Sequence, residues 1–562
     1  MGEAPLDGER QRRSSIEKQP ILSDRDIGDL DDDPEPSAID SLPEEIIQQI
    51  LEAADPSSFA SLILVNSKWR NASQQGRLYA LQLMRCPSYS MSHKKPPNGA
   101  QHNLPALRTL FAREVKRNLF DAYLRPNHTI VKIVSNSISS SSCPGGDGMS
   151  FSPSPKGHFL LAYNSSRINI IDLRGPTLKV ERELKILRRP AATCVKDDGF
   201  LLAVLLTEMQ VDLYDLTQRP PRRTQSIILD HSPRTIALSP CGTVLAAAYE
   251  GGIEVQSLGS GALPTDRRSV KCDAVDALAF SFDGTQILGT TVQSAQPNTV
   301  ILTAPYYDPG SHLSSDNISA LWTTSILFPN TSRDCSHAVL IQESAHDEAA
   351  YAFTYDRSFE TFRAVRIDDL RNGTTYFTGP LPNTPLQAKL IPCTLPAASL
   401  CGDLVSAGFQ GKEVWLYGVP EDLEAVSDTS SNNLDVAANP DVVHRRLRNT
   451  FVEGFKVTEL SGVSAVKWVA GFGDSSLKER LVIAAKGAVP AKPITDEDGI
   501  DFEDGGRLTL VDFDYGLEDG RVAEITVEVG LEEPEVLEEE HRDMATEVAI
   551  AAQPDYHGRD TG

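Results

Sequence analysis

Four stretches of the chain decide its fold, because they repeat one pattern. They are FSPSPKGHFLLAY (151–163), CVKDDGFLLAVLL (194–206), ALSPCGTVLAAAY (237–249) and AFSFDGTQILGTT (279–291). Each stretch has a short run with apolar residues, then a polar turn that contains a Gly, then a second apolar run. Short apolar runs separated by turn residues predict β-strands joined by tight turns.

The spacing of the turns predicts how these strands are arranged. The turn glycines are Gly157, Gly199, Gly242 and Gly284, so successive units are 42, 43 and 42 residues apart. A third apolar run ends 16 or 17 residues after each of the first three glycines. A period of 40–45 residues with about four strands per unit is typical of a β-propeller blade. One blade exposes both faces until its neighbours stack on it, so the units must close around an axis.

Less regular units extend the array towards the C-terminus. They lie at 338–369, at 404–408 with 414–417, and at 463–469 with 481–485 and 508–513. We therefore expect an all-β propeller over residues 129–530, with about seven blades, while six or eight remain open. The repeat resembles the WD40 family in a degenerate form: LYDL (213–216) and IDL (171–173) stand where that family ends in Trp-Asp, and its opening Gly-His is absent.

The region 39–86 has a different, helical pattern: DSLPEEIIQQILEAADPSSFASLILVNSKWRNASQQGRLYALQLMRC (40–86). Ser41 and Glu44 have the spacing of a capping box for a first helix. Asp55-Pro56 begins a second helix, and Asn66 or Ser67 caps a third. So small a helical unit has a marginal core and usually needs a neighbour or a partner.

Two motifs in this region resemble the F-box. They are Leu42-Pro43-x-Glu45-Ile46-Ile47-x-x-Ile50-Leu51 and Leu62-x-x-Val65-Asn66-x-x-Trp69, with Ala53-Ala54 where the family usually has a bulky aliphatic residue. The resemblance covers less than a tenth of the chain. It implies docking onto the Skp-type adaptor of a cullin ubiquitin ligase. The residues that would form or support the adaptor-facing surface are Leu42, Pro43, Ile46, Ile47, Ile50, Leu51, Leu62, Val65 and Trp69.

The segment 87–128 contains one strongly amphipathic stretch, LPALRTLFAREVKRNLFDAYLR (104–125). Its apolar stripe lies opposite a basic face that carries Arg108, Arg113, Lys116 and Arg117. A helix lying on a lipid surface has the same pattern. We prefer a connector helix that packs the helical unit against the propeller and fixes their orientation.

Charge and targeting patterns narrow the function further. The formal net charge is −25, and the acidic excess is concentrated at 24–45 and 496–547, which leaves a nearly neutral body. We expect a disordered acidic tail at 1–38 and an acidic C-terminal tail at 531–562. The absence of a basic excess argues against nucleic-acid binding. No apolar run approaches the ~20 residues of a membrane span. The eight Cys lack metal-ligand spacing, so we expect reduced thiols in a cytoplasmic or nuclear protein.

The expected fold is thus multidomain α+β: a three-helix F-box-like module, a connector helix and a propeller. No motif of catalysis, cofactor binding or metal binding is found, so we expect a non-enzymatic subunit without cofactors. The resemblance implies a substrate receptor of a Skp–cullin–F-box ubiquitin ligase, which captures a target protein on the propeller for ubiquitin-dependent degradation. The alternative is a propeller scaffold in which residues 41–86 only pack on the β-structure. The two hypotheses differ in the exposure of the Ile46/Ile50/Leu62 stripe: the ligase hypothesis requires part of it to be exposed, and the scaffold hypothesis requires it to be buried. We assign no propeller residue to target binding.

Overall fold

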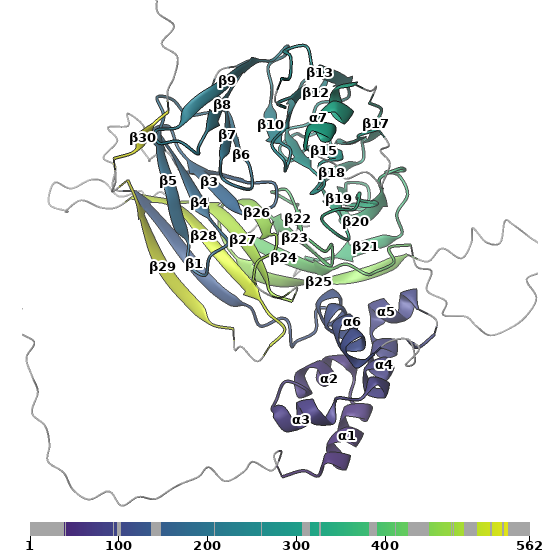
Figure 1. Ribbon diagram of the computed structural model, residues 1–562. Helices are drawn as coiled ribbons and strands as arrows, with labels where there is room; N and C mark the ends of the chain where they lie inside the picture. The colour runs from purple at the N-terminus through teal and green to yellow at the C-terminus, as the bar shows by residue number, and fades with distance from the viewer. Residues whose placement is uncertain are drawn as a thin grey trace, which may run out of the picture.

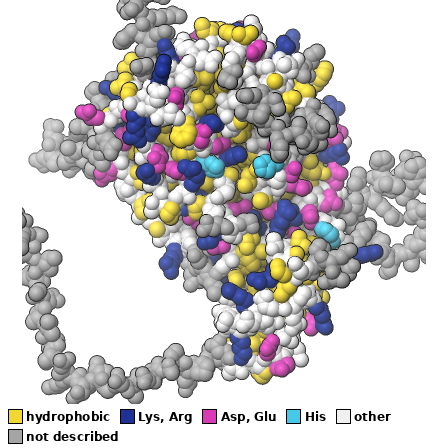
Figure 2. Space-filling view, viewed as in Figure 1, with side chains coloured by type: hydrophobic (Ala, Val, Ile, Leu, Met, Phe, Trp, Pro, Cys, Tyr) yellow, Lys and Arg dark blue, Asp and Glu magenta, His cyan; other side chains and the backbone are white. Residues whose placement is uncertain are grey.

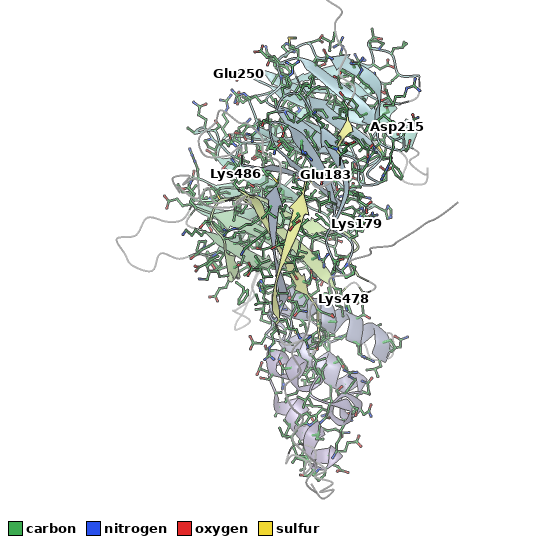
Figure 3. The ribbon with its side chains drawn as sticks, turned by 90° about the vertical axis from the view of Figure 1, so that its left-hand side faces the viewer. Lys179, Glu183, Asp215, Glu250, Lys478 and Lys486 are labelled. Atoms are coloured by element: carbon green, nitrogen blue, oxygen red, sulfur yellow. The ribbon has the colours of Figure 1, made fainter. Side chains whose placement is uncertain are left out.

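The computed structural model describes residues 39, 41–93, 95–97, 103–135, 148–206, 208–259, 261–305, 315–324, 327–380, 391–410, 412–424, 449–473, 475, 477–487, 503–516, 520–530 and 533–537. The tail predicted at 1–38 lies outside these residues, as does the tail predicted at 531–562 apart from 533–537, which contain a short strand. A helical module stands below a ring of β-sheets (Figure 1). The side view in Figure 3 shows the module as a narrow stalk under the sheets.

The helical module is built from six helices in chain order. They are α1 (Glu44–Ala53), α2 (Pro56–Leu62), α3 (Ser67–Ala72), α4 (Gly76–Arg85), α5 (Pro87–Ser92) and α6 (Leu104–Arg117). Four of them lie within 39–86, where three were predicted, because the predicted third helix is broken at 73–75. Two of the predicted caps are confirmed. The Asp55 carboxylate accepts hydrogen bonds from the first backbone N–H groups of α2, and the Asn66 side chain accepts one from Trp69 N at 3.0 Å.

Two predictions about helix ends were wrong. The helix α1 begins at Glu44 with Pro43 as its N-cap, so Ser41 lies two residues too early to cap it. Pro43 keeps an extended backbone, and it has no side-chain acceptor for the first turn. The stretch predicted as a helix over 104–125 ends at Arg117, because Leu119 adopts a left-handed backbone with φ 50°.

The strands form six sheets in the described part of the chain. Three of them are β2 (Ser150–Pro153), β3 (Phe159–Tyr163), β4 (Arg167–Asp172), β5 (Lys179–Lys185) and β30 (Glu535–Val536); β6 (Ala192–Val195), β7 (Leu201–Leu205), β8 (Gln210–Asp215) and β9 (Arg222–Ile228); and β10 (Thr235–Leu238), β11 (Val244–Tyr249), β12 (Gly252–Ser257) and β13 (Arg267–Lys271). The fourth is β14 (Ala277–Phe280), β15 (Gln286–Thr290), β16 (Thr299–Thr303) and β17 (Pro329–Ser332).

The two remaining sheets are larger. An eight-stranded sheet contains β18 (Cys335–Ile341), β19 (Tyr351–Asp356), β20 (Thr361–Arg366), β21 (Thr375–Thr378), β22 (Ala397–Ala398), β23 (Leu404–Phe409), β24 (Glu413–Gly418) and β25 (Thr450–Glu459). Its two halves join where β21 and β25 pair in parallel. The last sheet has the order β26 (Val463–Val469), β27 (Glu479–Lys486), β28 (Glu503–Phe513), β1 (Asn127–Ser135) and β29 (Val522–Val529).

The ring is closed by pairing between distant parts of the chain. The first strand of the β-region is β1. It pairs antiparallel with β28 and parallel with β29, which both lie near the C-terminal end of the β-region. The innermost strands also contact one another around the centre: β2 contacts β6 and β26, β10 contacts β6 and β14, and β22 contacts β18 and β26. They surround a central cavity of about 740 Å³. The chain therefore has the propeller architecture that its repeats predict.

One helix interrupts the region expected to be all-β. The helix α7 (Ser315–Thr324) packs against β11, β12 and β13. Its Trp322 is fully buried, and the indole N–H donates to the carbonyl of Gly284 at 2.9 Å. The repeat pattern gave no signal for this helix, because it lies in a connection between two strands.

Candidate functional site

Aromatic side chains from three helices pack together inside the module, in a hydrophobic cluster that continues into the propeller. Phe59 of α2, Tyr79 of α4 and Phe111 of α6 contact each other edge to face, with ring centroids 5.2 to 5.7 Å apart. Ile47 and Leu51 of α1 and Trp69 of α3 are buried in the same cluster. These three predicted site residues therefore support the module from inside and do not form its surface.

The opposite face of α1 carries apolar side chains that the chain leaves open. Ile46 is 40% exposed and Ile50 is 37% exposed, and both lie one helical turn apart on the same stripe. Val65, in the connection between α2 and α3, is 44% exposed. Pro43 is also exposed, while Leu42 and Leu62 are half-buried. Of the nine predicted residues, these six lie at least partly on the surface.

One apolar residue of this surface was missed from the sequence. Ile39 is 49% exposed just before the Leu42-Pro43 pair. Its position outside the helix gave no periodic signal. Figure 1 shows α1 at the end of the module away from the propeller, so the propeller does not cover the stripe. Scattered exposed apolar residues are common, but a row of them on one helix face is typical of a protein-interaction site.

The module is fixed to the propeller by a buried ionic cluster. Asp403, in the turn between β22 and β23, accepts hydrogen bonds from Arg113 Nε and Arg117 Nε of α6, both at 2.9 Å. Lys116 lies 3.7 Å from the Asp403 carboxylate and 3.0 Å from Glu479 of β27. Asp403 and Lys116 are only 2% exposed.

The cluster also controls the charge state of its neighbours. The Tyr123 hydroxyl donates to Glu479 Oε2 at 2.9 Å. Burial raises the pKa of Glu479 above its usual range, an effect that Lys116 opposes. The basic face of α6, for which a lipid surface was the alternative interpretation, is thus partly buried against the propeller. No sequence pattern pointed to Asp403 or Glu479, because they lie almost 300 residues or more after α6.

The comparisons with known proteins agree with this division of the chain. A family model described as F-box-like matches residues 39–82. A second, described as a domain of unknown function (DUF7165), matches residues 126–445 and 437–540. The chain belongs to the DUF7165 family. It is an F-box protein with a β-propeller.

Solved structures similar to this DUF7165 chain are distant. Hsv2 of Kluyvelomyces marxianus is 10% identical over 60% of this chain and 93% of its own, with a TM-score of 0.39. The Cps50 (Swd1) propeller domain of Myceliophteria thermophila is 12% identical over 66% of this chain and 98% of its own, with a TM-score of 0.38. Such TM-scores carry no argument, and the fold assignment rests on the strand pairing above. No curated protein matches the chain.

Three observations on the described residues of this DUF7165 chain concern metal ligands, membrane spans and cysteines. Within them, no group of three or more His, Cys, Asp or Glu side chains is arranged to hold a metal ion. None of the described helices combines the length and the apolar character needed to cross a bilayer. The seven described cysteines are free thiols.

Proposed function

We propose that this protein is the substrate-recognition subunit of a Skp–cullin–F-box ubiquitin ligase. In this proposal the module docks on the Skp-type adaptor, and through it on a cullin, while the propeller captures a target protein for degradation. The observation that carries the proposal is the exposed apolar stripe of α1 within the F-box-like region. F-box domains generally bind Skp-type adaptors through such apolar helices.

The buried ionic joint supports the second half of the proposal. A receptor accelerates ubiquitin transfer by holding the target near the charged conjugating enzyme, which turns an encounter of two proteins into an effectively intramolecular step. That effect depends on a fixed distance between the adaptor-binding and target-binding parts. Asp403 and Lys116 form a buried contact across the joint, so the module and the propeller hold one orientation. No residue of this chain needs to take part in the reaction.

The proposal includes the blade count and the domain boundaries. We infer seven blades: β2–β5, β6–β9, β10–β13, β14–β17, β18–β21, β22–β25, and β26–β28 completed by β1. The ring of contacts between innermost strands supports this count. We keep the boundaries 39–86 for the module, 87–128 for the connector and 129–530 for the propeller, and a cytoplasmic or nuclear location.

Binding to a purified Skp-type adaptor tests the docking surface. We expect Ile46→Glu and Ile50→Glu each to weaken adaptor binding by roughly 100-fold, because each variant places a charge in a desolvated apolar contact. Both side chains are more than one-third exposed, so the variants should fold like the wild type. Gln75→Glu is the matched control, since it adds the same charge at another exposed position of the module.

The scaffold alternative makes the opposite prediction. If the wild type and both Ile variants bind the adaptor equally, or if none of them binds, the stripe has no role in docking. The protein would then be a propeller scaffold whose helical module only packs on the β-structure.

A further inference from the structure

A cleft of about 770 Å³ lies between the helical module and the propeller. Arg70 of α3 and Arg108 of α6 line its module side, and Glu343, Leu477 and Tyr515 line its propeller side. Figure 3 labels Lys478, the neighbour of Leu477, close to the junction of the two parts. In Figure 2 blue and yellow side chains gather at the same junction. The cleft is separate from the stripe of α1.

Two of the three arginines that line the cleft, Arg70 and Arg108, are cations without an acidic partner among the described residues. Arg113 and Lys116 also line the cleft, but Asp403 and Glu479 neutralise them. Arg70 forms no ion pair with a described carboxylate, and the guanidinium of Arg108 contacts only the neutral Gln74 amide oxygen, at 3.3 Å.

Both arginines line the same cleft as Tyr515, whose hydroxyl donates to the carbonyl of Ala60 at 3.2 Å. Burial raises the pKa of this phenol, while the nearby Arg108 and Arg70 oppose the increase. Two arginines that line one cleft favour a carboxylate ligand, because a guanidinium binds a carboxylate through two parallel hydrogen bonds.

The chain itself carries an acidic segment just before the module. Residues 24–37, which lie outside the described part, contain seven Asp and Glu, three of them consecutive at Asp31–Asp33, against Arg25 alone. This segment leads directly into the module at Ile39 and Leu42. Because the segment is joined covalently to the N-terminal end of the module, its effective concentration at the cleft is ~mM, which a free acidic peptide does not reach.

The C-terminal acidic segment is less well placed. The last described strand, β30, pairs with β5. Figure 1 shows β30 on the side of the propeller far from the module.

We propose that residues 24–37 bind in this cleft, with the carboxylates of Asp31–Asp33 on Arg70 and Arg108. The bound segment bridges the module and the propeller and excludes other acidic peptides from the cleft. The proposal does not depend on adaptor binding or on ubiquitin transfer.

The test uses a fluorescein-labelled peptide of residues 22–37 and the full chain, measured by fluorescence anisotropy at low salt. The protein titrated with the peptide, called the host, is the full chain carrying Asp31→Asn/Asp32→Asn/Asp33→Asn. These substitutions weaken the binding of its own residues 24–37 to the cleft. We expect this host to bind the peptide at least 10-fold more tightly than the wild type, because the wild-type segment competes. Adding Arg70→Glu/Arg108→Glu to the host should weaken binding at least 10-fold.

The matched control is Arg222→Glu/Arg268→Glu in the same host, which makes the same charge change at two exposed positions on the outer strands β9 and β13. It should leave the affinity unchanged. Equal binding to the wild type and the host would overturn occupation by the chain's own segment. Equal loss in the control pair, or no loss with Arg70→Glu/Arg108→Glu, would overturn the cleft as the site. Should the double reversal fail to fold, Arg108→Gln in the host gives the same comparison with a smaller expected loss.

Discussion

The joint between α6 and the propeller offers a sharp test through Asp403→Asn. The substitution keeps the shape of the side chain and removes its charge. It leaves Lys116 and Arg117, which are 2% and 8% exposed, with one fewer carboxylate. Removing one partner of a buried ion pair typically costs about 3–5 kcal/mol, because the remaining charge stays buried without compensation.

We expect Asp403→Asn to lose about 3 kcal/mol in the free energy of unfolding, since Glu479 and Glu114 still neutralise part of the charge. Urea unfolding followed by tryptophan fluorescence measures the loss. Hydrogen exchange should rise in α6 and in the turn at 399–403. Asp368→Asn is the control, because its ion pair with Arg366 lies at the surface and should contribute no measurable stability. If the two variants unfold at the same urea concentration, the joint is not the stabilising contact described above.

Two further predictions concern single buried positions. Burial lowers the pKa of His337 from 6.5 to about 4, so the stability that depends on its neutral form is complete above pH 6.5 and is lost as the pH falls towards 4. Between pH 7.5 and 4.5 the wild type should therefore lose about 2–3 kcal/mol more unfolding free energy than His337→Asn does, and parallel pH profiles would contradict this. A Cβ at Gly418 would lie 1.8 Å from the carbonyl oxygen of Arg117, so Gly418→Ala should cost about 1–3 kcal/mol by forcing β24 and α6 apart, whereas Gly148→Ala, with no atom within 4 Å, should have little effect.

Turns and helix caps could be predicted from the sequence, because each depends on contacts between residues that are close together in the chain. Gly157, Gly199, Gly242 and Gly284 were identified as turn positions from their spacing alone, and all four have φ between 74° and 77°, which other residues adopt only with strain. The caps at Asp55 and Asn66 were predicted for the same reason, because a cap contacts its own helix within three residues.

Contacts between distant segments left no such signal. The pairing of β1 with β28 joins Val131 to Leu508, and the ion pair of Arg117 with Asp403 spans 286 residues. The capping box failed because α1 begins at Glu44 with Pro43 as its N-cap, so Ser41 does not occupy the N-cap position. The division of the nine predicted docking residues into exposed and buried sets also needed the packing of α1 on α3 and α4, which periodicity describes only approximately.

Hydrogen exchange of the full chain with and without a purified Skp-type adaptor tests the central claim most directly. The account predicts that the adaptor protects backbone amides of 42–65, around Ile46, Ile50 and Val65, and leaves the propeller strands unchanged. Protection of the propeller without protection of α1, or no protection at all, would contradict it.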